Sequence, residues 1–209
     1  MRRCVIIGGA EIRNYEFVRG YLRSEDFCIF CDCGLEHKSG LGVRADLVVG
    51  DFDSHDLPVN ISPENLIVLP REKDDTDTMY AIREGIRRGF EEFLLVGVIG
   101  ARLDHTLVNV YGLLKLARAG KFAKILDDYS EMEIVLPDEV KRVSGDFRYF
   151  SLVSISGIAR GVNITGAKFP LEDGEIESEY QFATSNEVLP NHVAEITLRE
   201  GSLLLIRVV

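Results

Sequence analysis

The sequence predicts an α/β N-terminal domain with a mainly parallel sheet, followed by a smaller all-β sandwich or barrel-like C-terminal domain. In the first part, short β-rich runs alternate with segments of helical periodicity, which is typical of parallel βαβ units. After about Asp127 no long helical period appears, and short strands are separated by Gly, Pro and Asn. We therefore expect an α/β domain at residues 1–127 and a β-rich domain at residues 128–209.

Six short runs are the expected strands of the first domain. They are Val5–Ile7, Cys28–Cys31, Leu47–Val49, Leu66–Leu69, Phe93–Val98 and Lys124–Leu126. Apolar residues recur at helical spacing at positions 79, 82, 86 and 90, and again at 107, 110, 114 and 117. Asp74 or Asp75 is available as the N-cap of the first helix, and Gly120 as the C-cap of the second. A weaker helix is expected at 15–22.

The second domain is expected to consist of short strands. They are Glu133–Leu136, Tyr149–Ile155, Gly161–Ile164, Val193–Leu198 and Leu203–Val209. We expect the last of these to be integral to the domain, so that its deletion would unfold it.

The composition excludes some classes of function. A net charge of -10 and a pI near 4.9 argue against a nucleic-acid or anionic-membrane surface, because both require a basic patch. No segment approaches the ~18 apolar residues of a membrane span, and we expect a cytoplasmic protein. The 4 Cys residues are expected to be reduced core thiols, in preference to a metal or redox site.

Carboxylates follow two of the predicted strands. Asp51 and Asp53 come directly after an apolar run, and on an extended chain both would face the same side. A turn opened by Asp53 is the alternative. Asp74, Asp75 and Asp77 lie at the expected start of a helix, where the macrodipole favours one or two of them without any function.

Two cationic side chains accompany these carboxylates. Lys73 could neutralise a neighbouring carboxylate or contact a phosphate. Arg102 and the N–H groups at the next helix start could bind a phosphate, with Asp104 as a site residue or simply the N-cap, and His105 as a base or simply solvated. Converging carboxylates suit Mg²⁺, so the pattern indicates a Mg²⁺-dependent enzyme acting on a phosphorylated substrate. There is no G-x-G-x-x-G or G-x-x-x-x-G-K-[ST] motif.

Four motifs in series resemble thiamine pyrophosphokinase. They are Gly50-Asp51-Phe52-Asp53-Ser54, Lys73-Asp74-Asp75-Thr76-Asp77, the segment from Gly100 to Asn109, and Ser185-Asn186-Glu187. The resemblance implies transfer of the diphosphoryl group of ATP to the hydroxyl of thiamine, releasing AMP. It also implies a homodimer in which each site is shared between the subunits.

The resemblance assigns the site residues. Asp51, Asp53 and Asp77 would hold Mg²⁺, and Arg102 and Asp104 would lie near the phosphates and the attacking hydroxyl. The residues implied on the ATP side are Gly9, Asp32, Gly34, Lys73, Asp74 and Asn109. The residues implied on the thiamine side are Phe169, which would stack on the vitamin, and Ser185 and Asn186, which would hydrogen-bond to it.

The alternatives concern both single residues and the whole function. Phe169 could be ordinary core, and Ser185 and Asn186 could only form a turn. Cys33 stands where the family's Asp-Gly-Gly-type turn has a glycine. The competing functions are a Mg²⁺- or Mn²⁺-dependent phosphohydrolase and a non-catalytic nucleotide- or thiamine-sensing module.

Overall fold

The computed structural model describes residues 1–52, 62–70, 72 and 74–209. The chain forms two compact units, Met1–Asp128 and Tyr129–Val209. The first is an α/β unit and the second consists of antiparallel sheets, as the sequence predicts.

Six parallel strands form the sheet of the first unit, in the spatial order β4-β3-β2-β1-β5-β6. Their bounds are β1 Arg3–Ile7, β2 Phe27–Cys31, β3 Leu47–Gly50, β4 Leu66–Val68, β5 Glu92–Val96 and β6 Phe122–Leu126. Each lies on one of the six expected runs. β5 ends earlier than expected because Gly97 adopts a positive φ of 62°, which breaks the extended chain.

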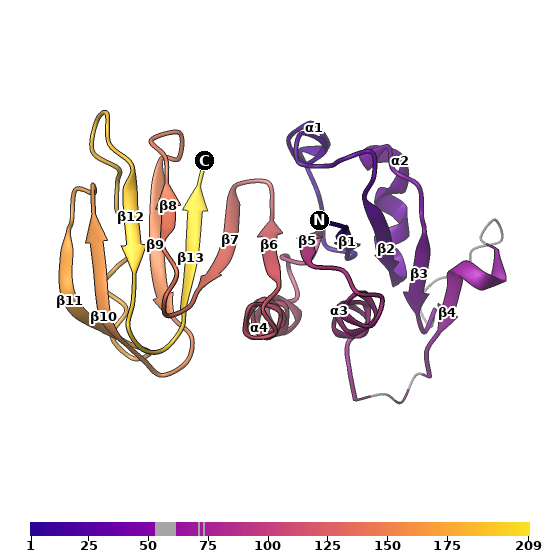
Figure 1. Cartoon of the computed structure of the whole chain (residues 1–209). Helices are drawn as coiled ribbons and strands as arrows, with labels where there is room; N and C mark the ends of the chain where they lie inside the picture. The colour runs from indigo at the N-terminus through magenta and orange to yellow at the C-terminus, as the bar shows by residue number, and fades with distance from the viewer. Residues whose placement is uncertain (53–61, 71, 73) are drawn as a thin grey trace. The chain divides into compact units, whose positions relative to one another are not determined.

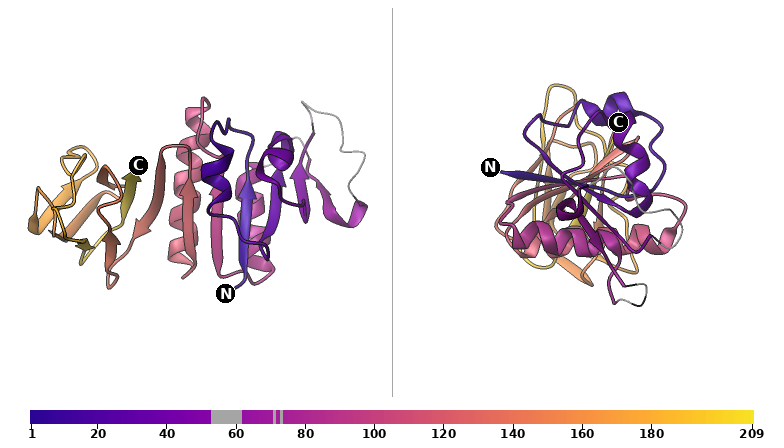
Figure 2. Two further views of the ribbon diagram at one scale, coloured as in Figure 1. Left: turned by 90° about the horizontal axis from the view of Figure 1, so that it is seen from above. Right: turned by 90° about the vertical axis from the view of Figure 1, so that its right-hand side faces the viewer.

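Helices cover both faces of this sheet, with α1 and α2 on one face and α3 and α4 on the other (Figures 1 and 2). Their bounds are α1 Tyr15–Arg19, α2 Lys38–Leu41, α3 Asp77–Arg87 and α4 Leu103–Arg118, with 3-10 helices η1 Asp32–His37 and η2 Pro63–Asn65. Because both faces are covered, the strands read as continuous apolar runs. All five residues of β1 are buried.

Three helix ends differ from the expectation. Thr76, and neither of the two aspartates before it, is the N-cap of α3, and its Oγ1 accepts a hydrogen bond from the Met79 N–H at 3.2 Å. α4 is capped by Ala119, followed by Gly120 at φ 69°. α1 ends at Arg19, three residues earlier than expected.

Because the strands are parallel, their carboxyl ends all lie at one edge of the sheet. β1 lies between β2 and β5, with Ile6 opposite Ile29 on one side and Leu95 on the other. The strand order reverses at this point, since β2 to β4 continue to one side and β5 and β6 to the other. Open α/β sheets bind ligands at such a reversal, outside the carboxyl ends of the strands.

The second unit contains two antiparallel sheets, in the orders β7-β13-β9 and β11-β10-β12-β8. The bounds are β7 Ser130–Val135, β8 Lys141–Val143, β9 Tyr149–Ser154, β10 Ile158–Thr165, β11 Leu171–Glu177, β12 Ala194–Thr197 and β13 Leu203–Val208. The sequence did not predict β8 and β11. β8 has only three residues, and β11 carries four carboxylates within seven residues, so neither shows an apolar run.

Buried side chains from both sheets form one core in the second unit, including Val135, Phe150, Ile164 and Leu205. β13 pairs with β7 on one side and β9 on the other, which fits the expected integral role of the last strand. Within the described ranges, no helix has the length and apolarity required to span a membrane.

Candidate functional site

Glycines allow the carboxyl ends of β1, β2 and β3 to approach each other closely. A Cβ atom on Gly34 would lie 2.4 Å from the Ile7 carbonyl oxygen, and one on Gly9 would lie 2.0 Å from the Cys33 Sγ. A Cβ atom on Gly50 would lie 3.1 Å from the Cα of Asp32. A larger residue at position 34 would therefore push backbone apart, whereas at position 9 it would displace the Cys33 thiol, which fills the space beside Gly9.

Asp32 is the first residue after β2 and the first of η1. Its φ is 46°, a left-handed conformation that non-glycine residues adopt rarely and often at functional positions. Its Oδ1 atom is buried, and it has no hydrogen-bond partner among the residues that the structure describes. Such an acceptor costs free energy unless a donor or cation reaches it, so it points to a ligand position.

Asp51 follows β3, at the same edge of the sheet as Asp32. The expectation of an extended chain from Asp51 to Asp53 is wrong at Phe52, where φ is 51°. The left-handed turn removes the simple alternation that would direct both carboxylates to one side. Asp53 and Lys73 lie outside the described residues.

Asp77 is the first residue of α3 and is half-buried beside the end of β2. Burial raises the pKa of the Cys31 thiol well above its ordinary value, and the negative charge of Asp77 raises it further. Asp77 is therefore within electrostatic range of the β2 end. By contrast, Asp75 forms an ion pair with Arg83, and Asp74 is exposed.

The donor chemistry of this edge fits Mg²⁺. Asp32, Asp51 and Asp77 supply carboxylate oxygens, which are the ligands that hard divalent cations prefer, and the buried Oδ1 of Asp32 requires a partner. Across the described ranges, no three His, Cys, Asp or Glu side chains form a group that could hold a metal ion. The Mg²⁺ site therefore stays a prediction.

Arg102 and Asp104 form a two-point ion pair at the start of α4. Arg102 Nη2 lies 2.6 Å from Asp104 Oδ2, and Nε lies 3.0 Å from Oδ1. The hydrogen bonds from Arg102 hold the pKa of Asp104 well below its ordinary value, which makes this carboxylate a weak base. Asp104 is the second residue of α4, so the N-cap alternative is wrong; His105 follows it and is exposed.

Two hydrogen-bonded contacts tie the start of α4 to the segment after β5. Thr106 Oγ1 accepts from the Gly100 N–H at 3.1 Å, and the buried Asn109 Nδ2 donates to the Val98 carbonyl at 2.7 Å. The family resemblance assigns Asn109 to the ATP side, and this bond gives it a role in orienting the loop that carries Arg102. Thr106 was not singled out from the sequence, because its partner is the backbone of a preceding loop.

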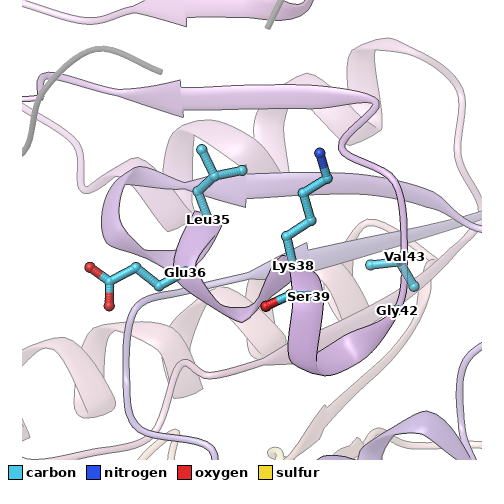
Figure 3. A pocket seen from close by; sticks show the side chains of 6 residues that line it. All are labelled: Leu35, Glu36, Lys38, Ser39, Gly42 and Val43. Atoms are coloured by element: carbon cyan, nitrogen blue, oxygen red, sulfur yellow. The ribbon is translucent and has the colours of Figure 1, made fainter. Parts of the chain in front are cut away.

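A hollow of about 540 Å³ lies beside η1 and α2 (Figure 3). It is lined by Leu35, Glu36, Lys38, Ser39, Gly42 and Val43. None of the predicted site residues lines it. The candidate site is therefore defined by the strand ends and not by this hollow.

Phe169 in the second unit is exposed, with 59% of its surface accessible, so the core alternative is wrong. Its backbone is hydrogen-bonded to the side chain of Asn186, which is buried. Ser185 has φ 56°, and its N–H donates to Ser151 Oγ at 3.0 Å, so Ser185 takes part in a turn. The hydroxyl of Ser185 is on an exposed residue.

All four cysteines are free. Cys4, Cys28 and Cys31 are buried, whereas Cys33 is only half-buried in η1, so the expectation of a core thiol is wrong for Cys33. Burial raises the pKa of Cys28 to about 12, and the charge of Asp46 contributes to the same shift. These thiols are protonated at neutral pH and behave as small apolar side chains.

Two family models match this chain in series. "Thiamin pyrophosphokinase, catalytic domain" matches residues 18–125, and "Thiamin pyrophosphokinase, vitamin B1 binding domain" matches residues 132–203. The first match covers more than half of the chain and includes both carboxylate segments and the Arg102 loop. The second includes Phe169 and Asn186.

Similar proteins span the whole chain. A thiamine pyrophosphokinase of Bacillus subtilis is 24% identical, with 99% of both chains covered. A solved thiamin pyrophosphokinase structure from Geobacillus thermodenitrificans has a TM-score of 0.82 at 28% identity, covering 99% of this chain and 97% of that one. The Candida albicans structure has a TM-score of 0.76 at 14% identity, covering 100% and 89%, and shows likeness of fold alone.

Proposed function

The chain belongs to the thiamin pyrophosphokinase family, and we propose that it transfers the diphosphoryl group of ATP to the hydroxyl of thiamine, giving thiamine diphosphate and AMP. The chain is thus an enzyme of the kinase class. The observation that carries the proposal is the succession of the two matches, a catalytic domain followed by a vitamin B1 binding domain. The proposal includes a cytoplasmic location, where ATP is available.

The mechanism assigns a task to each part of the first unit. Gly9 and Gly34 would allow the strand ends to pack closely beside the nucleotide, because a Cβ atom on either would meet a neighbouring segment of the chain. Arg102 and the N–H groups at the start of α4 would bind phosphate oxygens. The lowered pKa of Asp104 makes it a weak base for the thiamine hydroxyl. We therefore assign Asp104 the task of orienting Arg102.

Asp51, Asp53 and Asp77 would hold Mg²⁺, with Asp32 as a further acceptor at the same edge. When bound there, Mg²⁺ would supply Lewis-acid chemistry and neutralise negative charge on the phosphates. Without a cation these carboxylates would repel the triphosphate, so their task would be to hold the metal at the carboxyl ends of β2 and β3 and at the start of α3.

Product analysis tests the function. The purified chain is incubated with thiamine, ATP and Mg²⁺, and we expect AMP and thiamine diphosphate in equal amounts. Phosphate release that needs no thiamine would instead indicate a phosphohydrolase, and binding without turnover a sensing module. Either result would overturn the proposal.

Removal of the metal should abolish this reaction. After treatment with EDTA and gel filtration, we expect AMP formation to fall to background, because the phosphate charge is no longer neutralised. Addition of Mg²⁺ to the same sample should restore it. Full activity in demonstrably metal-free buffer would contradict the assigned role of the carboxylates.

We also propose a homodimer in which the first unit of one subunit and the second unit of the other complete each site. The test mixes Asp77→Asn with Phe169→Ala, one substitution in each unit, and lets subunits exchange. Random exchange makes about half of the dimers mixed, and each mixed dimer has one intact site, so activity should rise to about a quarter of wild type.

The control for this experiment mixes Asp77→Asn with Asp51→Asn. Both substitutions lie in the first unit, so no mixed dimer has an intact site and activity should not rise. Activity is measured at a thiamine concentration near the wild-type KM, where Phe169→Ala alone is expected to be weak. If the first mixture does no better than the mean of its two components, the sites are not shared.

A further inference from the structure

The side chain of Asn186 is held between two backbone segments of the second unit. Its Oδ1 accepts from the Phe169 N–H at 3.0 Å and from the Glu187 N–H at 2.9 Å, and its Nδ2 donates to the Phe169 carbonyl at 2.8 Å. Both backbone polar groups of Phe169 are thus bound by one side chain. The carboxamide oxygen uses both of its acceptor positions in these bonds.

Asn186 is itself anchored to the core. It is 4% exposed, and its backbone N–H and carbonyl pair with the carbonyl and N–H of Phe150 at 2.8 and 2.9 Å. Phe150 lies on β9 and is 1% exposed. The backbone of Phe169 is therefore connected through this side chain to a buried strand, beside the hydrogen bond that the Lys168 N–H donates to the Glu187 carbonyl at 2.8 Å.

The ring of Phe169 is presented to solvent from this fixed backbone. It is 59% exposed, and a neighbouring cation, the Lys168 ammonium, lies 5.7 Å from its centroid. Lys168 also pairs with Glu187 at 2.7 Å. A ring exposed to this extent contributes little to folding, but a ring with a restrained backbone can bind a flat cationic ligand with less loss of conformational freedom.

We propose that Asn186 is a positioning residue, which holds Phe169 in place for stacking on thiamine and acts on thiamine through that ring. This inference rests on the proposed function. It differs from the role that the family resemblance implies for Asn186, a direct hydrogen bond to the vitamin. A residue that contacts the ligand directly should keep its effect when Phe169 is removed, whereas a positioning residue should lose it.

The experiment is a double-mutant cycle with Asn186→Ala, Phe169→Ala and the double variant. We expect each single substitution to raise the KM for thiamine by about 10-fold, and the double variant to match Phe169→Ala within about 2-fold. The KM for ATP should change by less than about 2-fold in all three, because the substitutions affect thiamine binding alone. Multiplicative effects of the two substitutions on the thiamine KM would overturn the proposal.

Asn163→Ala is the matched control for general damage to the second unit. Asn163 also binds backbone groups, donating to the Gly161 carbonyl and accepting from the Asp173 N–H, but it has no assigned contact with Phe169. It should lower the melting temperature without a selective change in the thiamine KM. An equal rise in thiamine KM for Asn163→Ala would reduce Asn186 to an ordinary structural residue.

Two further measurements test the proposal if Asn186→Ala does not fold or if the protein shows no turnover. If Asn186→Ala does not fold, Asn186→Asp can replace it, because it keeps both acceptor bonds and loses only the donor. Its rise in the thiamine KM should be smaller and should likewise vanish in the Phe169→Ala background. Calorimetric binding of thiamine without ATP repeats the cycle independently of turnover. If the wild-type protein binds thiamine but makes no thiamine diphosphate, the proposed function is wrong. The double-mutant cycle can then still be evaluated from thiamine binding.

Discussion

Asp77→Asn is expected to lower kcat by about 10²–10³-fold, with the fold intact, because it removes one of the carboxylates that we propose to hold the cation beside the triphosphate. Asp77 lies in the first turn of α3, near the end of β2. Asparagine has the same shape, and the N-cap of α3 is Thr76, so the helix should still form. The measurement is kcat for AMP formation at saturating thiamine, ATP and Mg²⁺.

Asp75→Asn is the matched control, since Asp75 lies two residues away and forms an ion pair with Arg83. This half-exposed pair is a minor contribution to stability, so its loss should leave kcat within a few-fold of wild type. Thermal unfolding and calorimetric binding of thiamine should be near normal in both variants. If Asp77→Asn retains kcat close to that of wild type, Asp77 does not belong to the metal site.

Gly34→Ala is expected to lower both stability and ATP affinity. The added Cβ would lie 2.4 Å from the Ile7 carbonyl oxygen and 2.9 Å from the carbonyl carbon of Gly8, so backbone must move. Overpacking of this kind costs about 1–3 kcal/mol. For a chain of this size each kcal/mol lowers the melting temperature by about 2–4 °C. The KM for ATP should rise as well, because the displaced segments are those that we propose to lie beside the nucleotide.

Gly145→Ala separates this steric effect from the general effect of replacing glycine. A Cβ atom on Gly145 would meet nothing within 4 Å, and its φ is not in the left-handed region. We expect no loss of stability and an unchanged KM for ATP. A melting temperature for Gly34→Ala equal to that of Gly145→Ala would mean that the strand ends are not tightly packed.

The strands of the first unit were predictable because a parallel sheet covered on both faces needs apolar residues at every position, so each strand appears as a short apolar run. β11 in the second unit was not predictable in this way. It is an edge strand with four carboxylates, and its place follows from pairing with β10. Charge at an exposed edge protects against pairing with other chains and removes the alternation that signals a strand.

By itself the sequence determined the fold class, the order of the acidic segments and the residue types that suit a cation and a phosphate. These follow from composition and spacing along the chain. Only the tertiary structure decided that Phe52 turns the chain away from an extended path, that Asp32 buries an unpartnered oxygen among the described residues, and that Asn186 binds the backbone of Phe169. The physical reason is that a hydrogen bond or a steric contact depends on distance in space, and Phe169 and Asn186 are 17 residues apart in the chain.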